Sequence, residues 1–453
     1  MAVFQLHNKQ NNSNITITPD DKGLSISSPE ASTFHVDYWK VVNCYIDDEK
    51  VIYLSVLLSE HNNELVDFYG IANDLDQGNE TLIQDIRSKS KLKSARRLKA
   101  LVNPVGGTGK AVDYYVETVA PILKTSGCIV DMQVLEYKRH AFDIAKALEL
   151  EYDAVVCVSG DGILHEVLNG FLHHQTPSEA FKMPLCPVPG GSGNGISVCV
   201  LGAEDGLDLS IAALNAAKGD AIPLDLFSIW QDGKRTLSYL TQAAGLMASI
   251  DIGTENLRWM GDTRFTVGYL RSLFWNAPCP CEIYIKVEED NKDEMIKLLH
   301  EKRLEKPFSL PEYTQIPPVT YKNGPQQDWI KISDDVFYLY AGQVPWVSKD
   351  LKQFPVSMPN DGFIDVAVQL NVSRMHKLKA MDGAEHGAMF FDDSLKYYKA
   401  KAYHFNPLDN SGYLAADGEQ IPLLPFTVEV LPSLGRLISP FTSWNNSFQE
   451  DNL

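Results

Sequence analysis

Three glycine-rich stretches hold the residues of this chain that are best suited to chemistry. The most informative one reads Ser159-Gly160-Asp161-Gly162 and follows the continuous apolar run 154–158. A carboxylate is poorly suited to holding a phosphate by itself, because like charges repel each other. Asp161 therefore indicates a general base or a partner of magnesium, and not a simple cradle for an anion.

The other two stretches each end another apolar segment, and they read Asn103-Pro104-Val105-Gly106-Gly107-Thr108-Gly109-Lys110 and Gly190-Gly191-Ser192-Gly193-Asn194-Gly195. The first resembles a Walker loop, but it lacks the four-residue gap between glycines and has Ala111 in place of Ser or Thr. One such loop alone is usually a plain turn. Three of them on one sheet edge would offer free backbone amides to a triphosphate, with Lys110 adding positive charge. The joint pattern predicts nucleotide binding.

The elements that must position these loops alternate between strand and helix from Arg96 onward. Strands are predicted at 98–102, 129–135, 154–158 and 185–189, and helices at 111–126, 141–148, 163–172 and 207–218. Pro121 is expected to kink the first of these helices or to begin its last part. Such alternation implies a parallel sheet with helices on both faces, which binds ligands at the carboxyl ends of its strands.

The remaining chain is predicted to be rich in β-strands. Residues 1–95 read as short strands followed by a helix near 76–92, a pattern that resembles a pleckstrin-homology-like module; the alternative is an elaboration without a ligand of its own. Lys89–Lys99 reads as a basic, solvated linker. From Pro223 onward, strands separated by turn residues favour an antiparallel sandwich or barrel. The predicted domains are therefore 1–95, 96–222 and 223–440, with a helical stretch at 257–275, an insertion at about 290–327 and a disordered tail at 441–453.

Bulk properties exclude some classes of function. The net charge of −19 over 453 residues argues against a nucleic-acid partner and against simple docking on anionic lipid, and it is compatible with a cationic ligand. No run of residues reaches the length of a transmembrane helix, and the first residues do not resemble a signal peptide. Seven scattered cysteines, with Cys279 and Cys281 as the only close pair, predict reduced thiols in a cytoplasmic protein.

In combination, the three loops resemble the signature loops of the diacylglycerol-kinase catalytic superfamily. The segment 245–264, with Asp251, Glu255 and Arg258-Trp259-Met260-Gly261, is similar to the sphingosine kinases and especially to the long-chain-base kinases of fungi and plants. Asp417-Gly418-Glu419 completes the resemblance, which covers about residues 96–440 and leaves out residues 1–95 and about 290–327.

The resemblance implies a phosphofructokinase-like nucleotide domain and an antiparallel β-sandwich lipid domain, with the active site between them. It also implies ATP-dependent phosphorylation of the primary hydroxyl of a sphingoid base to a 1-phosphate. Mg²⁺ is expected with ATP, without assigned protein ligands. Peripheral membrane contact is expected of a cytoplasmic enzyme with a lipid substrate, and a homodimer is left open.

The resemblance assigns roles to particular residues. Asp161 would be the general base. The nucleotide would contact Asn103, Pro104, Val105, Gly106, Ser159, Gly160, Gly162, Glu166, Gly191, Ser192, Gly193, Arg258, Arg264, Asp417, Gly418 and Glu419. Thr241 and Asp251 would bind the substrate. One departure concerns the loop before His140, where Leu135 stands at the offset at which the family usually has Thr.

Elementary chemistry agrees with the role of Asp251. A sphingoid base is a cation with a long alkyl tail, so its site needs one carboxylate to bind the amine. The alternative is a structural role, in which Asp251 is the N-cap of a helix. Apolar residues of the following segment would line the tail pocket or simply pack in the core: Phe265, Leu270, Leu273, Phe274 and Trp275. The rival readings are a diacylglycerol or ceramide kinase, whose substrates lack the amine, and a catalytically inactive lipid-binding scaffold.

Overall fold

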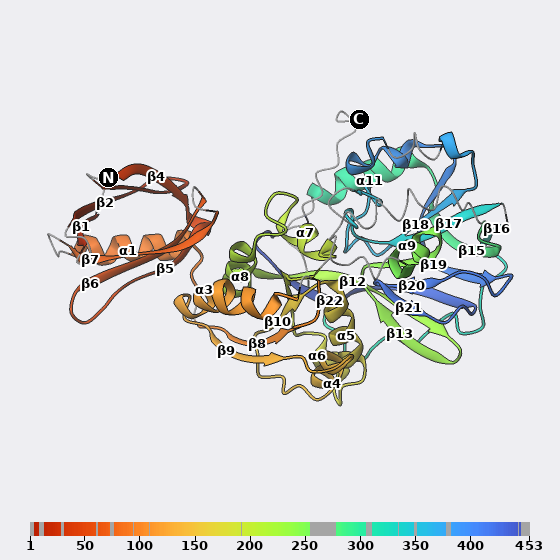
Figure 1. Cartoon of the computed structure of the whole chain (residues 1–453), viewed down its shortest axis with the longest axis horizontal. Coiled ribbons are helices and arrows are strands. Elements are labelled where there is room, and N and C mark those ends of the chain that lie inside the picture. The colour runs from red at the N-terminus through yellow and green to blue at the C-terminus, as the bar shows by residue number, and fades with distance from the viewer. Residues whose placement is uncertain are drawn as a thin grey trace. The chain divides into compact units, whose positions relative to one another are not determined.

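A computed structural model describes residues 4–8, 13–28, 31–59, 62–72, 77–93, 95–107, 109–191, 193–253, 278–304, 310–333, 335–347, 351–376, 382–442 and 444 (Figure 1). Contacts divide the chain into two compact units. The first comprises Met1–Lys99, Asp113–Asp131 and Asp208–Gly219, and the second comprises Ala100–Val112, Met132–Leu207 and Asp220–Leu453. This division groups segments that are distant in sequence, and the three predicted domain ranges stay a prediction.

The first unit contains a seven-stranded antiparallel sheet in the order β4-β3-β2-β1-β7-β6-β5. Its strands are β1 Phe4–Asn8, β2 Ser13–Pro19, β3 Gly23–Ser28, β4 Ala31–Asp37, β5 Val41–Ile46, β6 Val51–Leu58 and β7 Glu64–Ala72. Helix α1 (Gln77–Lys89) packs Leu82, Ile83 and Ile86 onto the apolar face of the sheet (Figure 1). The predicted small sheet with one helix is confirmed, while the likeness to a pleckstrin-homology-like module stays a prediction.

Two helices of the first unit end near each other, and basic side chains donate hydrogen bonds to carbonyls at their ends. The last carbonyls of a helix lack partners within the helix and carry partial negative charge. Lys218, at the end of α8 (Leu209–Lys218), donates from Nζ to the carbonyl of Ser90 just beyond α1, at 3.0 Å. Lys93 and Arg96 donate to the carbonyl of Gly219. The segment predicted to be a solvated linker is therefore bound at these two residues.

The helix predicted at 111–126 is interrupted, as Pro121 led us to expect. It consists of α2 (Ala111–Tyr114), a π-helical segment at Tyr115–Val119 and α3 (Ala120–Thr125), in which Pro121 stands at the amino end. Proline removes a backbone donor and clashes with the preceding turn, so the hydrogen-bond pattern changes just before it.

Residues 97–189 contribute the parallel part of a fifteen-stranded sheet, whose order is β21-β20-β14-β17-β18-β19-β22-β11-β10-β8-β9 along its main path. Its strands are β8 Arg97–Val102, β9 Ile129–Val134, β10 Ala154–Ser159 and β11 Leu185–Pro189, and β10 pairs with β11 in parallel. The helices between and after them are α4 His140–Lys146, α5 Asp161–Leu172, α6 Pro177–Ala180 and α7 Gly195–Leu201. The predicted strand–helix alternation is confirmed.

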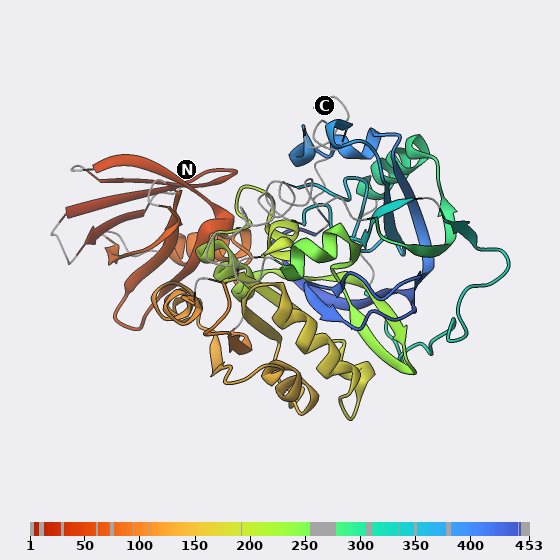
Figure 2. The ribbon, with the colours of Figure 1, turned by 45° about the vertical axis from the view of Figure 1, so that its right-hand side comes forward.

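The later half of the chain forms the antiparallel part (Figure 2). It contains β12 Asp220–Gln231, β13 Lys234–Ser238, β14 Thr241–Gly245, β15 Cys281–Glu289, β16 Ile330–Ile332, β17 Val336–Gly342, β18 Ile364–Leu370, β19 Leu395–Pro407, β20 Leu414–Ala416, β21 Glu419–Ile421 and β22 Phe426–Ser439. The fourteen-residue strand β22 pairs antiparallel with β12 and β19 and in parallel with β11 at Leu437. One long strand thereby joins the antiparallel part to the parallel part in a single sheet.

Two helices interrupt the later, β-rich half of the chain. Helix α9 (Leu246–Gly253) follows β14, and α11 (Lys292–Leu304) begins the predicted insertion. The helical stretch predicted at 257–275 and most of the predicted tail lie outside the described residues, although Trp444 is buried and donates to the carbonyl of Pro223. All seven cysteines are described and are free thiols, as predicted. Among the described residues, no helix has the length and apolar character needed to cross a membrane.

Candidate active site

The three glycine-rich loops meet, and their glycines allow the backbones to touch. A Cβ atom on Gly191 would lie 2.3 Å from Cα of Gly160, and one on Gly107 would lie 2.7 Å from the carbonyl carbon of Gly191. Contacts this close exclude any side chain, which is the physical reason for glycine at these positions. Gly107 also has a φ of +57°, a conformation that glycine adopts without strain.

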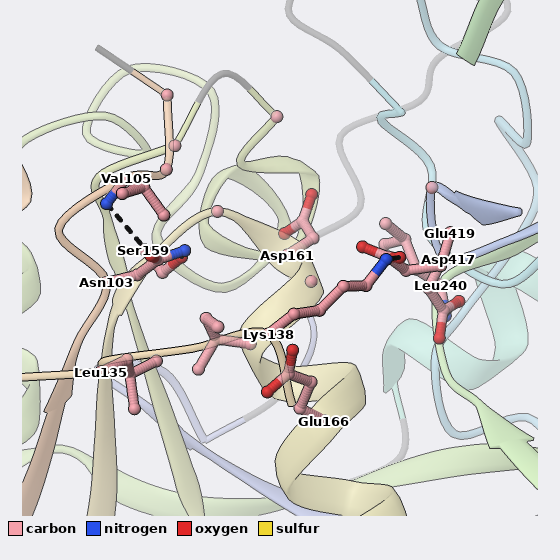
Figure 3. Close-up of a pocket in the computed structure, with 18 of the residues that line it drawn as sticks. Asn103, Val105, Leu135, Lys138, Ser159, Asp161, Glu166, Leu240, Asp417 and Glu419 are labelled. Atoms are coloured by element: carbon pink, nitrogen blue, oxygen red, sulfur yellow. Dashed lines mark hydrogen bonds and ion pairs between the residues drawn. The ribbon is translucent and has the colours of Figure 1, made fainter. Parts of the chain in front are cut away.

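A cavity of about 510 Å³ opens where the loops meet (Figure 3). Fifteen of the residues expected at the site line it: Asn103, Pro104, Val105, Gly106, Ser159, Gly160, Asp161, Gly162, Glu166, Gly191, Gly193, Thr241, Asp417, Gly418 and Glu419. Ser192, Arg258 and Arg264 lie outside the described residues, as does the side chain of Asp251, whose backbone belongs to α9. Lys110, expected to add positive charge, is exposed and is not among the lining residues.

Asp161 is the first residue of α5, and only Gly160 separates it from the fully buried strand β10. Its carboxylate accepts hydrogen bonds from the amides of Gly195, at 2.9 Å, and Ile196, at 3.3 Å, in the loop-to-helix junction that follows β11. These bonds fix the orientation of the carboxylate at the wall of the cavity, between the glycine loops and the hairpin of Asp417 and Glu419 (Figure 3). Such fixed geometry suits a side chain that must meet one group of a bound molecule.

Glu166 follows Asp161 by five residues in α5 and holds the neighbouring loop. Its two carboxylate oxygens accept from the amides of Arg139, at 3.0 Å, and Ala141, at 3.2 Å, at the start of α4. Burial raises the pKa of Glu166, the amide hydrogen bonds oppose this, and the negative charge of Glu419 adds to it, so that the pKa lies above its ordinary value. Glu166 thus shapes the loop at which the sequence departs from the family pattern.

That loop brings Lys138 into the cavity, which sequence reasoning missed. The Nζ of Lys138 lies 3.0 Å from Oε2 of Glu419, with side chains that are 78% and 41% exposed. Among the lining residues that the structure describes, Lys138 is the only Lys or Arg, beside five carboxylates. The available signal was its place in a loop between a predicted strand and helix of a parallel sheet, at the ligand-binding edge.

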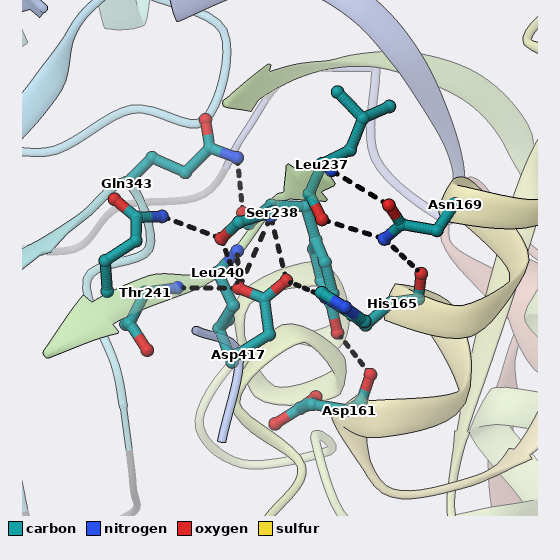
Figure 4. Close-up of polar contacts among 11 residues, drawn as sticks. Asp161, His165, Asn169, Leu237, Ser238, Leu240, Thr241, Gln343 and Asp417 are labelled. Atoms are coloured by element: carbon teal, nitrogen blue, oxygen red, sulfur yellow. Dashed lines mark hydrogen bonds and ion pairs between the residues drawn. The ribbon is translucent and has the colours of Figure 1, made fainter. Parts of the chain in front are cut away.

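Asp417 and Gly418 form the two-residue turn between β20 and β21. Their φ angles are +51° and +79°, and Ala416 pairs with Glu419 across the turn. An Asp-Gly pair with two positive φ values is typical of a type I′ hairpin, whose twist matches that of the flanking strands. The side chain of Asp417 is fully buried and accepts from Ser238 Oγ, at 2.6 Å, and from the amide of Thr241, at 3.0 Å (Figure 4).

The other lining residues missed in the sequence come from several elements. Leu135, Glu136 and Tyr137 precede Lys138, Ile163 lies in α5, and Leu240, Tyr340 and Val347 belong to the β-rich half. Apart from Leu135, at which the sequence departs from the family pattern, no local pattern marks them, because each is an ordinary core or loop residue in the sequence. Among the described residues, no cluster of three or more His, Cys, Asp or Glu side chains could hold a metal ion by itself.

Comparison with known proteins gives the family. Residues 97–229 match the diacylglycerol kinase catalytic domain, and residues 336–439 match the YegS C-terminal NAD kinase beta sandwich-like domain. The chain is 34% identical over 355 residues to "Sphingoid long chain base kinase 4" of Schizosaccharomyces pombe, covering 77% of this chain and 76% of that protein. It is 28% identical over 423 residues to "Sphingoid long chain base kinase 5" of Saccharomyces cerevisiae, covering 78% of this chain and 61% of that protein.

More distant proteins agree. Human "Sphingosine kinase 1" is 27% identical over 370 residues, covering 77% of this chain and 93% of its own length. A structure described as a putative diacylglycerol kinase from Bacillus anthracis superposes with a TM-score of 0.53 at 17% identity, covering 77% of this chain and 98% of that chain. That likeness shows the shared fold. With the three loops, the cavity and the two family matches in place, the chain belongs to the sphingoid long-chain-base and sphingosine kinases, a family of lipid kinases with a diacylglycerol kinase catalytic domain.

Proposed function

We propose that the protein transfers the γ-phosphoryl group of ATP to the primary hydroxyl of a sphingoid long-chain base, with Asp161 as the general base. The observation that carries this proposal is the place of Asp161, whose carboxylate lies at the wall of the cavity where the three glycine loops meet. Family membership supplies the class of reaction, and the cavity supplies a place for it.

In the proposed step, the oxygen of the substrate hydroxyl attacks the γ-phosphorus, and Asp161 takes the proton of that hydroxyl. The bond from that phosphorus to the bridging oxygen breaks, which leaves ADP and a sphingoid base 1-phosphate. The transition state is loose and anionic, so positioning and positive charge contribute most of the catalysis. The fixed orientation of the Asp161 carboxylate serves the positioning.

The nucleotide is proposed to lie against the three loops. Because these loops are rich in glycine, side chains do not cover their backbone amides, which can contact the phosphates. Lys138 would supply positive charge, because an exposed ion pair such as Lys138–Glu419 contributes only about 0–1 kcal/mol and is easily exchanged for a phosphate contact. Arg258 and Arg264 are proposed to add charge from the segment outside the described residues. Carboxylates such as Glu419 are the oxygen ligands that suit Mg²⁺, which when bound with ATP would neutralise phosphate charge.

The acceptor is proposed to bind with its ammonium group at Asp251 and its reactive end near Thr241. Thr241 begins β14 at the cavity wall, and α9, which carries Asp251, follows that strand directly. Because the substrate has a long alkyl tail, transient contact with a membrane belongs to the proposal, and flotation of the protein with lipid vesicles that contain the base would test it.

The proposal is tested by incubating the protein with labelled ATP and a panel of sphingoid bases, ceramide and diacylglycerol. We expect label in the sphingoid bases and none above background in the other two. The Asp161→Asn variant should lose turnover by about 10³-fold or more and keep its fold and ATP affinity, since an amide cannot accept the proton. Activity of that variant near the wild-type level would remove Asp161 from the role of base.

Diacylglycerol or ceramide kinase activity is the second candidate, favoured by the match to the diacylglycerol kinase catalytic domain. Only the sphingoid base carries an amine, so only the favoured reading needs a carboxylate to bind that amine. Under the favoured reading, Asp251→Ala raises KM for the sphingoid base by about 10-fold or more and leaves KM for ATP unchanged. Phosphorylation of diacylglycerol in preference to the bases would select the second candidate.

A further inference from the structure

One face of helix α5 is tied to the segment Leu237–Thr241, which runs from the end of β13 to the start of β14 (Figure 4). Asp161, His165 and Asn169 lie four residues apart and therefore share a face of the helix. The carbonyl of Asp161 accepts from the hydroxyl of Tyr239, at 2.9 Å, and Asn169 exchanges two hydrogen bonds with the backbone of Leu237, at 2.8 and 2.9 Å.

The middle attachment runs through Asp417. Nδ1 of His165 lies 2.8 Å from Oδ2 of Asp417, and the other carboxylate oxygen accepts from the amides of Leu240, at 2.9 Å, and Thr241, at 3.0 Å. Ser238 Oγ and the amide of Tyr239 also donate to this carboxylate. A carboxylate offers about four lone-pair positions, so five donors leave no position for a phosphate or a metal ion.

The segment that these contacts hold forms part of the cavity wall. Leu240 and Thr241 line the cavity from this segment, while Asp161 and Ile163 line it from α5. The amide of Asp417 donates in turn to the carbonyl of Thr241, at 2.8 Å, which closes the connection between the hairpin turn and β14. The spacing between Asp161 and β14 is therefore set by the buried carboxylate and its donors.

We propose that Asp417 and His165 are positioning residues for phosphoryl transfer, which hold the general base on α5 at a fixed place relative to the acceptor side of the cavity. This inference rests on the proposed function and gives Asp417 a different role from the nucleotide contact expected from the sequence. Asp417 acts through Leu237–Thr241 and through His165, and its side chain does not touch the nucleotide. Displacement of a reacting group by about 1 Å can cost roughly 100-fold in rate, so loss of the pair should act on kcat.

The kinetic test compares His165→Ala, Asp417→Asn and the double variant with wild type. We expect each single variant to lower kcat by about 10- to 100-fold, while the dissociation constant of a fluorescent ATP analogue stays within about 2-fold. The double variant should be no slower than the slower single variant, because the two residues act as one unit. His173→Ala is the matched control: this histidine follows the same helix, is exposed, and should leave kcat unchanged.

A conservative variant separates positioning from simple loss of packing. The amide of Gln can still donate to Asp417, so His165→Gln should recover a large part of the kcat that His165→Ala loses. Weaker binding of the ATP analogue by Asp417→Asn, in proportion to its loss of kcat, would make Asp417 a nucleotide ligand and overturn the proposal. Independent losses that multiply in the double variant would overturn it as well.

Hydrogen exchange provides a readout that does not depend on activity. The amides of Leu240 and Thr241 should be protected in the wild-type chain and should exchange at least about 10-fold faster in Asp417→Asn, with α5 otherwise folded. If the wild-type protein phosphorylates none of the lipids in the panel, the proposed function fails, and the exchange experiment still decides on the attachment. Unprotected amides at Leu240 and Thr241 in the wild-type chain would overturn the positioning role by themselves.

Discussion

Three carboxylates at the cavity make hydrogen bonds with backbone amides, and their geometry separates their tasks. Asp161 accepts from two amides at the edge of the cavity, Glu166 holds the start of α4, and Asp417 is enclosed by the turn before β14. An amide donor next to a carboxylate fixes its orientation at little entropic cost, because the backbone is already ordered. All three side chains are carboxylates, and their surroundings decide which part of the structure each one holds in place.

The first prediction concerns the charge of His165. Burial alone would lower its pKa, but the hydrogen bond and charge of Asp417, together with the charges of Glu419 and Glu166, raise the pKa above the ordinary value of about 6.5. A raised pKa in the folded state stabilises the protein at low pH, and this contribution is lost as the pH rises through that pKa.

We therefore expect His165→Gln to destabilise the protein by about 2 kcal/mol near pH 6 and by less near pH 9, as measured by urea unfolding at both pH values. The His173→Ala variant, whose side chain is exposed, is the control for general effects of removing a histidine. A destabilisation by His165→Gln that is equal at the two pH values would show that the charged form of His165 is not the stabilising one.

At the scale of elements, the cavity depends on three strand ends that pack glycine against glycine. Strands β10 and β11 are parallel neighbours, and the loop after β8 reaches the loop after β11 through Gly107 and Gly191. Each loop ends a strand whose residues are nearly all buried, so the strands are fixed by the core and only the loops could move apart. The loops can therefore come this close only because glycine, which has no side chain, occupies the positions of contact.

The second prediction follows from this packing. A Cβ atom at Gly191 would overlap the backbone of Gly160 at 2.3 Å, so Gly191→Ala must push the two loops apart. We expect weaker binding of an ATP analogue, by about 10-fold or more, and a loss of about 1–3 kcal/mol of stability. Titration of the analogue and thermal unfolding measure the two effects.

Gly162→Ala is the steric control for this prediction. The nearest atom to a Cβ at Gly162 is Oε1 of Glu419, at an ordinary 3.8 Å, and the position lies in the first turn of α5, where alanine is favourable. Its unfolding temperature should match or exceed that of the wild type. Equal effects of the two substitutions on stability would argue against the packing of loop against loop.

At the scale of the whole molecule, the first compact unit is assembled from three separate parts of the chain. Lys218 connects them: its Nζ donates to the carbonyls of Tyr38, Val41 and Ser90, and its side chain lies over the ring of Trp39 at 4.7 Å. Burial lowers the pKa of Lys218 to about 7, helped by the charge of Lys91. Residues 1–90 therefore provide the acceptors for a buried amine that comes from far along the sequence.

The third prediction concerns a chain shortened to residues 96–453. This chain keeps the described residues that line the cavity. It loses the carbonyls to which Lys218 donates, and it loses Asn43, which donates to the carbonyl of Thr125. The five lost hydrogen bonds, which are three from Lys218, one from Asn43 and one from Lys93, at about 1 kcal/mol each should lower the midpoint of thermal unfolding by about 5–10 °C. Binding of the ATP analogue is the control for correct folding of the second unit, and an unchanged midpoint would contradict the prediction.

The local features of the fold and site could be predicted from the sequence. Continuous apolar runs such as 154–158 and 185–189 mark buried strands, and the glycines that follow them mark loops at the same sheet edge. The break in the helix before Pro121 and the free cysteines were predicted for the same reason, since each depends on residue type or on near neighbours. These features belong to the sequence by itself because their causes lie within a few residues.

Only the tertiary structure decided the features that depend on contacts between distant residues. The sequence marks Asp417 as part of a motif, but its carboxylate is enclosed by donors about 180 residues earlier in the chain, which no local pattern encodes. The same is true of Lys138 beside Glu419 and of β22, which joins two halves of one sheet. Whether a charged side chain faces a ligand or anchors a turn depends on what the rest of the chain packs against it, and that is settled only when the whole core forms.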